Sequence, residues 1–243
     1  MKFALIGYGK MGKTIEQVIK DQNKGDEIVL IIGEDNLQEL TIDNLRKVDV
    51  AIEFTRPDAA IPNISLCFDA GVPVVVGTTA WLNRLDEIKK QCEEKNGALF
   101  YAPNFSIGVN IFFEINRRLA AIMDTQPQYE VNMEEIHHTE KLDSPSGTAI
   151  KTAEVIMQHL KRKTQWQLTD DKAVGHTESL LITAKRSPDV PGTHIVTYSS
   201  DADDIQVIHQ AKTRRGFAEG AVMAARWLKG RKGVYEMKDL LSF

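Results

Sequence analysis

The first half of the chain alternates short apolar runs with stretches of helical periodicity, and this alternation is the strongest constraint on its fold. Strands that are apolar at every position are buried on both faces, and intervening helices connect them as parallel neighbours. The pattern therefore predicts an α/β domain built on a parallel sheet that helices cover on both sides. The expected strands are residues 3–6, 28–32, 48–54, 72–76 and 98–101, with helices at about 58–70 and 82–95.

The second half has a different pattern, in which strand-like runs follow one another with few helices between them. Residues 128–137 alternate apolar and polar side chains, and we therefore expect an α+β domain with a mostly antiparallel or mixed sheet. One face of that sheet is apolar, and because few helices remain to cover it we expect a subunit interface there. Further strands are expected at 178–185, 194–198 and 205–211, and helices at about 109–123 and 148–160.

A last helical run at about 218–228 is expected to return to the first domain. The predicted division is therefore a dinucleotide-binding domain of residues 1–106 and 215–243, and a substrate-binding and oligomerisation domain of residues 107–214.

Length and composition fit soluble domains and exclude several classes of protein. The chain has 243 residues, 42% of them hydrophobic, and no apolar run approaches the roughly 20 residues of a membrane helix. A net charge of −4 argues against nucleic-acid binding. The two cysteines, Cys67 and Cys92, lack CxxC spacing and are expected to be buried free thiols of a cytoplasmic protein.

A glycine-rich turn follows the first expected strand directly and precedes a helix, as a dinucleotide-binding G-x-G-x-x-G motif must. The first glycine permits the tight turn, the second lets the backbone approach a pyrophosphate, and the third lets helix and strand pack closely. The N–H groups at the helix start then attract the phosphates. The residues expected to bind the cofactor here are Gly7, Tyr8, Gly9, Lys10, Met11 and Gly12.

An acidic pair at the end of the second expected strand bears on the choice of cofactor. Glu34 is placed to accept hydrogen bonds from the adenosine ribose hydroxyls. Its carboxylate repels a 2′-phosphate, and Asp35 adds to this effect. The cofactor is therefore expected to be NADH or NADPH, with NADH favoured.

Three further loops follow expected strands, at the edge where open parallel sheets bind their ligands. Turn chemistry alone explains any one of them. Because they share one edge, we expect them to form the walls of a nicotinamide site. Their residues are Phe54, Thr55 and Arg56, then Gly77, Thr78 and Thr79, then Ala102, Pro103, Asn104 and Phe105.

Residues 135–149 concentrate groups suited to chemistry on a small anion. His137 and His138 stand at a strand end, where neighbouring side chains point to opposite sides, and imidazole suits proton transfer near neutral pH. Lys141 suits either binding a carboxylate or donating a proton. The spacing of these groups does not match a zinc site, so no metal is expected.

The same stretch ends at the start of an expected helix, whose free N–H groups form an anion site. Together with the histidines and the lysine, this site suits reduction of a small anionic substrate by hydride, with a proton donor beside it. The residues that open the helix are Ser146, Gly147 and Thr148.

This stretch resembles the signature of the dihydrodipicolinate reductase family, E-x-H-x-x-x-K-x-D-x-P-S-G-T-A, at every fixed position from Glu135 to Ala149. The resemblance extends over nearly the whole chain through GYGKMG, FTRP, GTT, PNFSIGVN and RRGFAEGA. It implies a Rossmann-like domain and a mixed-sheet domain that assembles a homotetramer. It also implies NAD(P)H-dependent reduction of 4-hydroxy-tetrahydrodipicolinate, a cyclic dicarboxylate, with loss of water, in the diaminopimelate route of lysine biosynthesis.

The resemblance further implies roles for individual residues. His137 matches the acid/base residue, Lys141 the proton donor, and His138 a contact of one substrate carboxylate. By the same resemblance, Gly147 and Thr148 at the helix start, next to Ser146, bind the other carboxylate. The resemblance also implies that the nucleotide binds to the glycine motif, Glu34 and the three loops above, and that Arg214 and Phe217 lie near the cofactor.

Two other functions remain open from the sequence. One keeps the fold and changes the substrate, as in an NAD(P)-dependent imine or amino-acid dehydrogenase. The other is a non-catalytic NADH sensor, although no DNA-binding segment accompanies the acidic chain. The remaining histidines, which are expected to have no functional role, are His159, His176, His194 and His209.

Overall fold

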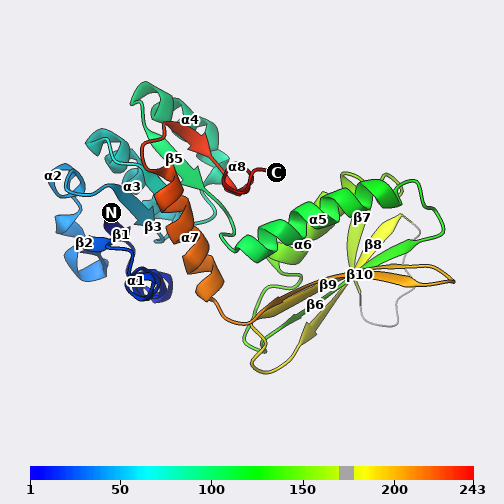
Figure 1. Ribbon diagram of the computed structural model, residues 1–243. Coiled ribbons are helices and arrows are strands. Elements are labelled where there is room, and N and C mark those ends of the chain that lie inside the picture. The colour runs from blue at the N-terminus through cyan, green and yellow to red at the C-terminus, as the bar shows by residue number, and fades with distance from the viewer. Residues whose placement is uncertain (170–177) are drawn as a thin grey trace. The chain divides into compact units, whose positions relative to one another are not determined.

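The computed structural model describes residues 1–169 and 178–243. The chain divides into two compact units (Figure 1). The first comprises Met1–Ile107 and Arg215–Phe243, and the second comprises Gly108–Arg214. His176 lies outside the described residues.

The first unit is built on a six-stranded sheet with the order β11-β5-β4-β3-β1-β2. Its described strand pairings are parallel, as the apolar runs predict. Every residue of β3, β4 and β5 is buried, which explains why these runs show no alternation. The strands are β1 (Lys2–Ile6), β2 (Glu27–Ile32), β3 (Val50–Glu53), β4 (Val74–Val76), β5 (Ala98–Tyr101) and β11 (Gly233–Tyr235).

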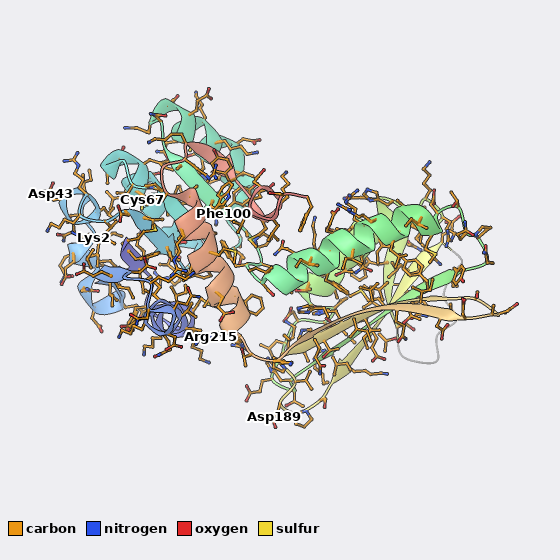
Figure 2. The ribbon with its side chains drawn as sticks, viewed as in Figure 1. Lys2, Asp43, Cys67, Phe100, Asp189 and Arg215 are labelled. Carbon is orange, nitrogen blue, oxygen red and sulfur yellow. The ribbon has the colours of Figure 1, made fainter. Side chains whose placement is uncertain are left out.

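Helices cover both faces of this sheet, because alternate side chains of each strand point to opposite sides. Phe3 and Leu5 of β1 pack into the core under α1, α7 and α8, and their neighbours in β1 pack under α2, α3 and α4. Phe100 of β5, labelled in Figure 2, lies in this core, and its ring meets Trp227 of α7 edge-on with the ring centroids 6.0 Å apart. The helices are α1 (Lys10–Gln22), α2 (Ile42–Leu45), α3 (Pro57–Ala70), α4 (Leu85–Glu94), α7 (Arg215–Leu228) and α8 (Met237–Leu241).

Several short elements of the first unit carry no signal in the sequence. The elements β11, α2 and α8 are three to five residues long, too short to show a period. Glu34–Glu39 and Leu82–Arg84 form 3-10 helices. The first of these follows β2 directly and carries both acidic residues of the expected ribose site.

The second unit contains a five-stranded mixed sheet with the order β10-β9-β6-β8-β7. The pairs β6–β8 and β7–β8 are parallel, whereas β6–β9 and β9–β10 are antiparallel, which confirms the predicted mixed sheet. Only β7 is absent from the predicted strands, because its sequence QWQLT is mostly polar. The strands are β6 (Glu130–His137), β7 (Gln165–Thr169), β8 (Ser179–Arg186), β9 (Gly192–Ser199) and β10 (Asp204–Ala211).

The expectation that a subunit interface covers the apolar face of this sheet is wrong. That face packs against α5 (Ile107–Met123) and α6 (Gly147–Met157) in one core. Val131 and Met133 of β6 are buried there. Two helices suffice because the sheet has only five strands. The opposite face carries residues such as Ile195 and Ile208, of which Ile208 is 57% exposed.

Both cysteines are free and buried, Cys67 on α3 and Cys92 on α4, as expected. Burial raises the pKa of the Cys67 thiol, so this group is unreactive. Among the helices that the structure describes, none has the length and apolarity to span a bilayer.

Candidate functional site

The turn after β1 has the geometry that the glycine motif predicts. Gly7 has a φ of 96°, which side chains other than glycine rarely adopt. A Cβ on Gly12 would stand 2.2 Å from the Gly7 carbonyl oxygen, so the start of α1 can approach the turn only without one. Gly9 at the N-cap of α1 offers no side chain to the first-turn N–H groups. The backbone therefore forms an anion-binding helix start.

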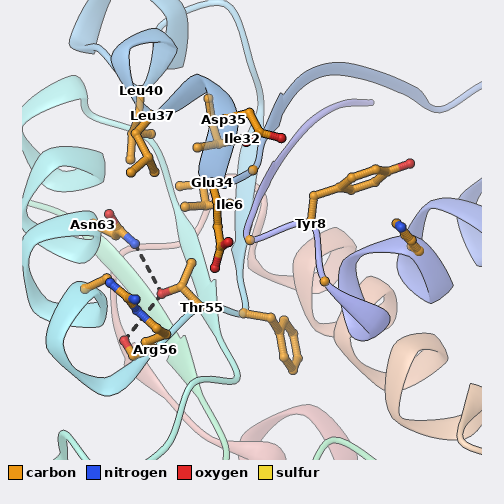
Figure 3. Close-up of a pocket in the computed structure, with 16 residues that line it drawn as sticks. Ile6, Tyr8, Ile32, Glu34, Asp35, Leu37, Leu40, Thr55, Arg56 and Asn63 are labelled. Carbon is orange, nitrogen blue, oxygen red and sulfur yellow. Dashed lines mark hydrogen bonds between the residues drawn. The ribbon is translucent and has the colours of Figure 1, made fainter.

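A cavity of about 800 Å³ opens at this turn, at the carboxyl ends of the neighbouring strands (Figure 3). Its lining includes residues expected at the pyrophosphate and ribose, namely Gly7, Tyr8, Gly9 and Glu34, together with Asp35. It also includes Phe54, Thr55 and Arg56, the first of the three loops expected around the nicotinamide. It also includes residues that the sequence motifs did not single out: Ile6, Lys13, Ile32, Gly33, Leu37, Leu40, Ala59 and Asn63. Ile6, Ile32, Leu37, Leu40 and Ala59 form its apolar wall, whereas Lys13 and Asn63 add polar groups. No pattern in the sequence separates the apolar members from ordinary core residues.

The side chain of Tyr8, in the glycine turn, is held in place by residues of α1. The Tyr8 hydroxyl donates to Glu16 Oε2, and Lys20 Nζ donates to the other oxygen, Oε1, at 2.7 Å. The Lys20 and Tyr8 hydrogen bonds lower the pKa of Glu16, so the carboxylate stays charged. Tyr8 is therefore held against the helix at the mouth of the cavity.

A buried acid connects two of the cofactor loops. Glu53, the last residue of β3, is 0% exposed and accepts hydrogen bonds from Thr55 Oγ1 and, at 3.3 Å, from Asn63 Nδ2. Thr55 N donates to Thr78 Oγ1 at 2.7 Å, which joins the loops after β3 and β4. Burial raises the pKa of Glu53. Sequence reasoning missed this residue, although an acid inside an apolar strand was a visible signal.

The other residues expected around the nicotinamide lie at the ends of β4 and β5, outside the lining of the large cavity. Phe105 is buried against Phe54, with ring centroids 5.8 Å apart. A second, much smaller hollow is lined in part by Thr78, Thr79, Ala102 and Pro103. Gly77, Asn104, Lys10, Met11 and Gly12 line neither hollow.

In the second unit, one end of the helix-covered sheet face changes from apolar to polar. The strand register sets Glu135 beside His194, and His194 beside His209. One row further, His137 stands beside Arg186. A cluster of titratable side chains therefore closes this end of the core.

Glu135 is the centre of this cluster and is 0% exposed. Its two oxygens accept from Ser146 N at 3.0 and 3.2 Å. His137 Nδ1 lies 3.5 Å from Glu135 Oε2, and His194 Nε2 lies 3.7 Å from the same oxygen. The Arg186 guanidinium stands 3.8 Å from the other oxygen. The carboxylate thus touches β8, β9 and the start of α6.

Burial governs the charge of the two buried rings. It lowers the pKa of His194 to about 3, with His137 and His209 adding to the effect. It also lowers the pKa of His137, while the Glu135 charge opposes the shift. Both imidazoles are therefore mainly neutral at pH 7. The expectation that His194 has no role did not foresee its place in this cluster.

The loop after β6 carries Lys141 and His138. Lys141 Nζ bonds both oxygens of Asp143, at 2.8 and 2.9 Å, and this contact lowers the pKa of Asp143. The Lys141 charge also lowers the pKa of His137, so these two expected catalytic residues share one site. His138 Nε2 lies 3.5 Å from the Arg214 guanidinium.

The start of α6 follows the expected pattern for an anion site. Ser146 is its N-cap and accepts from Ala149 N at 3.1 Å through Oγ, which also lies 3.2 Å from His194 Nε2. Gly147 is exposed, and Thr148 is half-buried. Ser146 is 2% exposed and therefore holds the helix start from inside, while its contact with substrate stays a prediction.

Arg214 and Phe217, both expected near the cofactor, belong to different units. Arg214 ends the second unit beside His138, whereas Phe217 is a half-buried residue of α7 in the first unit.

One donor set deserves comparison with a metal site. One ligand atom each from Glu135, His137 and His194 lies within 4.8 Å of the other two. The Glu135 oxygens already accept from the start of α6, and the two rings are spaced for contact with that carboxylate. The arrangement is that of a hydrogen-bonding cluster, and the absence of a metal stays a prediction.

Comparison with known proteins agrees with this arrangement. Residues 1–105 match the family model of the dihydrodipicolinate reductase N-terminus, and residues 108–241 match that of its C-terminus. The 4-hydroxy-tetrahydrodipicolinate reductase of Christiangramia forsetii is 46% identical over 242 residues, covering 100% of this chain and 98% of that protein. The enzyme of the same name from Ralstonia pickettii is 35% identical over 81% of this chain and 75% of its own length.

A solved structure shares the fold over almost the full length. Dipicolinate-bound dihydrodipicolinate reductase from Paenisporosarcina sp. TG-14 has a TM-score of 0.81 and 22% identity, with 97% of each chain covered. The chain therefore belongs to the dihydrodipicolinate reductase family, in both its N-terminal and its C-terminal parts.

Proposed function

We propose that this protein reduces 4-hydroxy-tetrahydrodipicolinate to tetrahydrodipicolinate. The reaction consumes one NAD(P)H and one proton and releases NAD(P)⁺ and water. The observation that carries the proposal is full-length similarity, at 46% identity, to a reductase of this name, combined with the intact stretch from Glu135 to Ala149. The product belongs to the diaminopimelate route of lysine biosynthesis.

The first unit fits a dinucleotide. The glycine turn offers backbone N–H groups to a pyrophosphate, and the cavity beside it carries an acidic pair at the end of β2. When bound, NAD(P)H supplies the hydride. Glu34 and Asp35 favour NADH, while Arg56 in the same cavity offers a positive charge to a 2′-phosphate. We therefore expect NADH to be preferred and NADPH to be used as well.

The second unit provides the groups for a cyclic dicarboxylate. His138 and the start of α6 at Gly147 and Thr148 hold the two carboxylates. Lys141 donates a proton at the reacting centre, and His137 acts as acid and base beside it. The dipicolinate bound in the structurally similar reductase supports a small dicarboxylate as the ligand. Arg214, next to His138, adds positive charge on the same side.

Assembly and location complete the proposal. The open face of the second sheet, with Ile195 and Ile208, is the surface through which we expect a homotetramer to form. The free, buried thiols suit a reducing compartment, and we expect the protein to act in the cytoplasm.

A coupled assay tests the activity. A synthase condenses pyruvate with aspartate semialdehyde, and oxidation of NADH or NADPH by this protein is followed by absorbance. Synthase-dependent oxidation is expected with both cofactors, with a higher kcat/KM for NADH. His137→Gln should lower kcat by about 10²–10⁴-fold while the fold survives.

Each other result has a definite meaning. A fully active His137→Gln variant removes the acid/base assignment. If Lys141→Ala raises only KM, Lys141 binds a carboxylate and does not donate the proton. A folded protein that binds NADH without oxidising it is either a dehydrogenase for another imine or an NADH sensor.

A further inference from the structure

Glu135 is a buried acid to which the proposed reaction assigns no task. It lies two residues before His137 on β6, so both side chains point to the helix-covered face of the sheet. A fully buried carboxylate is costly unless its oxygens are paired. The partners that balance it therefore indicate what it does.

One set of partners lies at the start of α6. Both oxygens accept from Ser146 N, and the Ser146 hydroxyl in turn accepts from Ala149 N. The carboxylate is thus bonded to the residue that caps the helix. The following residues, Gly147 and Thr148, are the ones expected to face the substrate.

The other set consists of the two buried imidazoles. Glu135 lies 3.5 Å from His137 Nδ1, an atom that makes no hydrogen bond among the described residues. In the absence of substrate, contacts of this kind are often slightly long and shorten in the reacting complex. On the far side of the ring, Gly192 lacks the Cβ that would lie 3.0 Å from Nε2. Nδ1 therefore faces the carboxylate, and Nε2 faces the backbone gap at Gly192.

We propose that Glu135 is a positioning residue that holds His137 by Nδ1 and the start of α6 by Ser146 N, so that one carboxylate sets the acid/base residue His137 against the anion site. The inference rests on the proposed function of His137. It adds to that function a second, buried residue whose charge determines how readily the ring is protonated.

The charges around His137 fix the sign of the effect. Burial lowers the pKa of His137, and Glu135 and Asp143 raise it. Lys141 and Arg186 lower it, and the neighbouring His194 is uncharged at neutral pH. Removing the Glu135 charge should therefore lower the His137 pKa, because the strongest attraction that favours the protonated ring is lost.

Three variants separate charge from shape. Glu135→Gln keeps an oxygen that accepts from Ser146 N but loses the charge. Glu135→Asp keeps the charge and withdraws it by one methylene. Glu134→Gln is the matched control, because Glu134 is the adjacent residue of β6, faces the other side of the sheet and pairs with Lys185.

Histidine NMR titration and the pH profile of kcat/KM are measured on the intact protein. The His137 signal is the one missing from the spectrum of His137→Gln. In Glu135→Gln the His137 pKa and the falling limb of the profile should both move down by about one pH unit. At pH values above the limb, kcat/KM should then be about tenfold lower than in the wild type. Substrate KM should stay within about threefold, since α6 remains anchored. Glu135→Asp should move the limb less, and Glu134→Gln should not move it.

An unchanged His137 pKa in folded Glu135→Gln would overturn the proposal and leave Glu135 a purely structural acid. If the pKa falls but His137→Gln is fully active, the coupling stands and the catalytic role of His137 falls instead. Should Glu135→Gln fail to fold, Arg186→Gln provides the opposite test. Loss of that cation should raise the His137 pKa, and a fall or no change would contradict the charge balance.

Discussion

At the scale of the residue, the loops that the sequence motifs name depend on a buried acid, Glu53, that no motif names. Glu53 supports the loops of the nucleotide cavity through Thr55 and Asn63. We predict that Glu53→Leu weakens NADH binding about tenfold, because these donors lose their acceptor, and lowers the free energy of unfolding by about 1–3 kcal/mol.

Glu53→Gln should bind NADH within about threefold of the wild type, since burial already disfavours the charged form and the amide oxygen still accepts. Fluorescence titration with NADH and urea unfolding measure the two effects, with the exposed Glu93→Leu on α4 as control. Wild-type NADH affinity in Glu53→Leu would show that the loops hold without this acid.

At the scale of the element, prediction from sequence succeeded where strands are uniformly buried or alternate cleanly, and failed where a strand is polar. The apolar runs of β3, β4 and β5 predicted the parallel sheet because their two covered faces leave no alternation. The edge strand β7 has a polar sequence, and periodicity missed it. The structure brings His137 and the start of α6 together, as residues 135–149 predicted, while their roles stay predictions. The place of His194 beside them depends on strand register, which a single sequence does not specify.

The open face of the second sheet is also a property of whole elements. Ile208 of β10, which is 57% exposed, pairs in register with the half-buried Ile195 of β9, and an exposed apolar side chain on an open sheet face suits an interface. We predict a wild-type mass about four times the 27.2 kDa of the chain, and a smaller species for Ile208→Lys, because a buried lysine disfavours association. Light scattering after gel filtration measures both, with Ile122→Lys on the exposed side of α5 as control. A monomeric wild type, or an Ile208→Lys variant of unchanged mass, would place the interface elsewhere.

At the scale of the whole molecule, the buried imidazoles link folding to pH. The pKa of His194 is about 3 in the folded protein and about 6.5 in an unfolded chain, and burial lowers the pKa of His137 and His209 as well. Below pH 6.5 the unfolded chain therefore binds protons that the folded protein does not. The free energy of unfolding then falls by about 1.4 kcal/mol per pH unit for His194 alone, or about 2 kcal/mol between pH 6.5 and 5.

This window is separate from that of the paired carboxylates, such as Glu114 with its pKa of about 2, whose stabilisation is lost only as pH falls below about 4.5. His194→Gln retains a partner for the Ser146 hydroxyl and removes one titrating group, so its stability should decline less steeply between pH 6.5 and 5. Urea unfolding at several pH values measures the slope, and His159→Gln, just beyond α6, controls for the loss of a histidine elsewhere. Equal slopes in His194→Gln and the wild type would mean that the ring takes up its proton in the folded protein, and that the cluster around Glu135 is open to charge at pH 5.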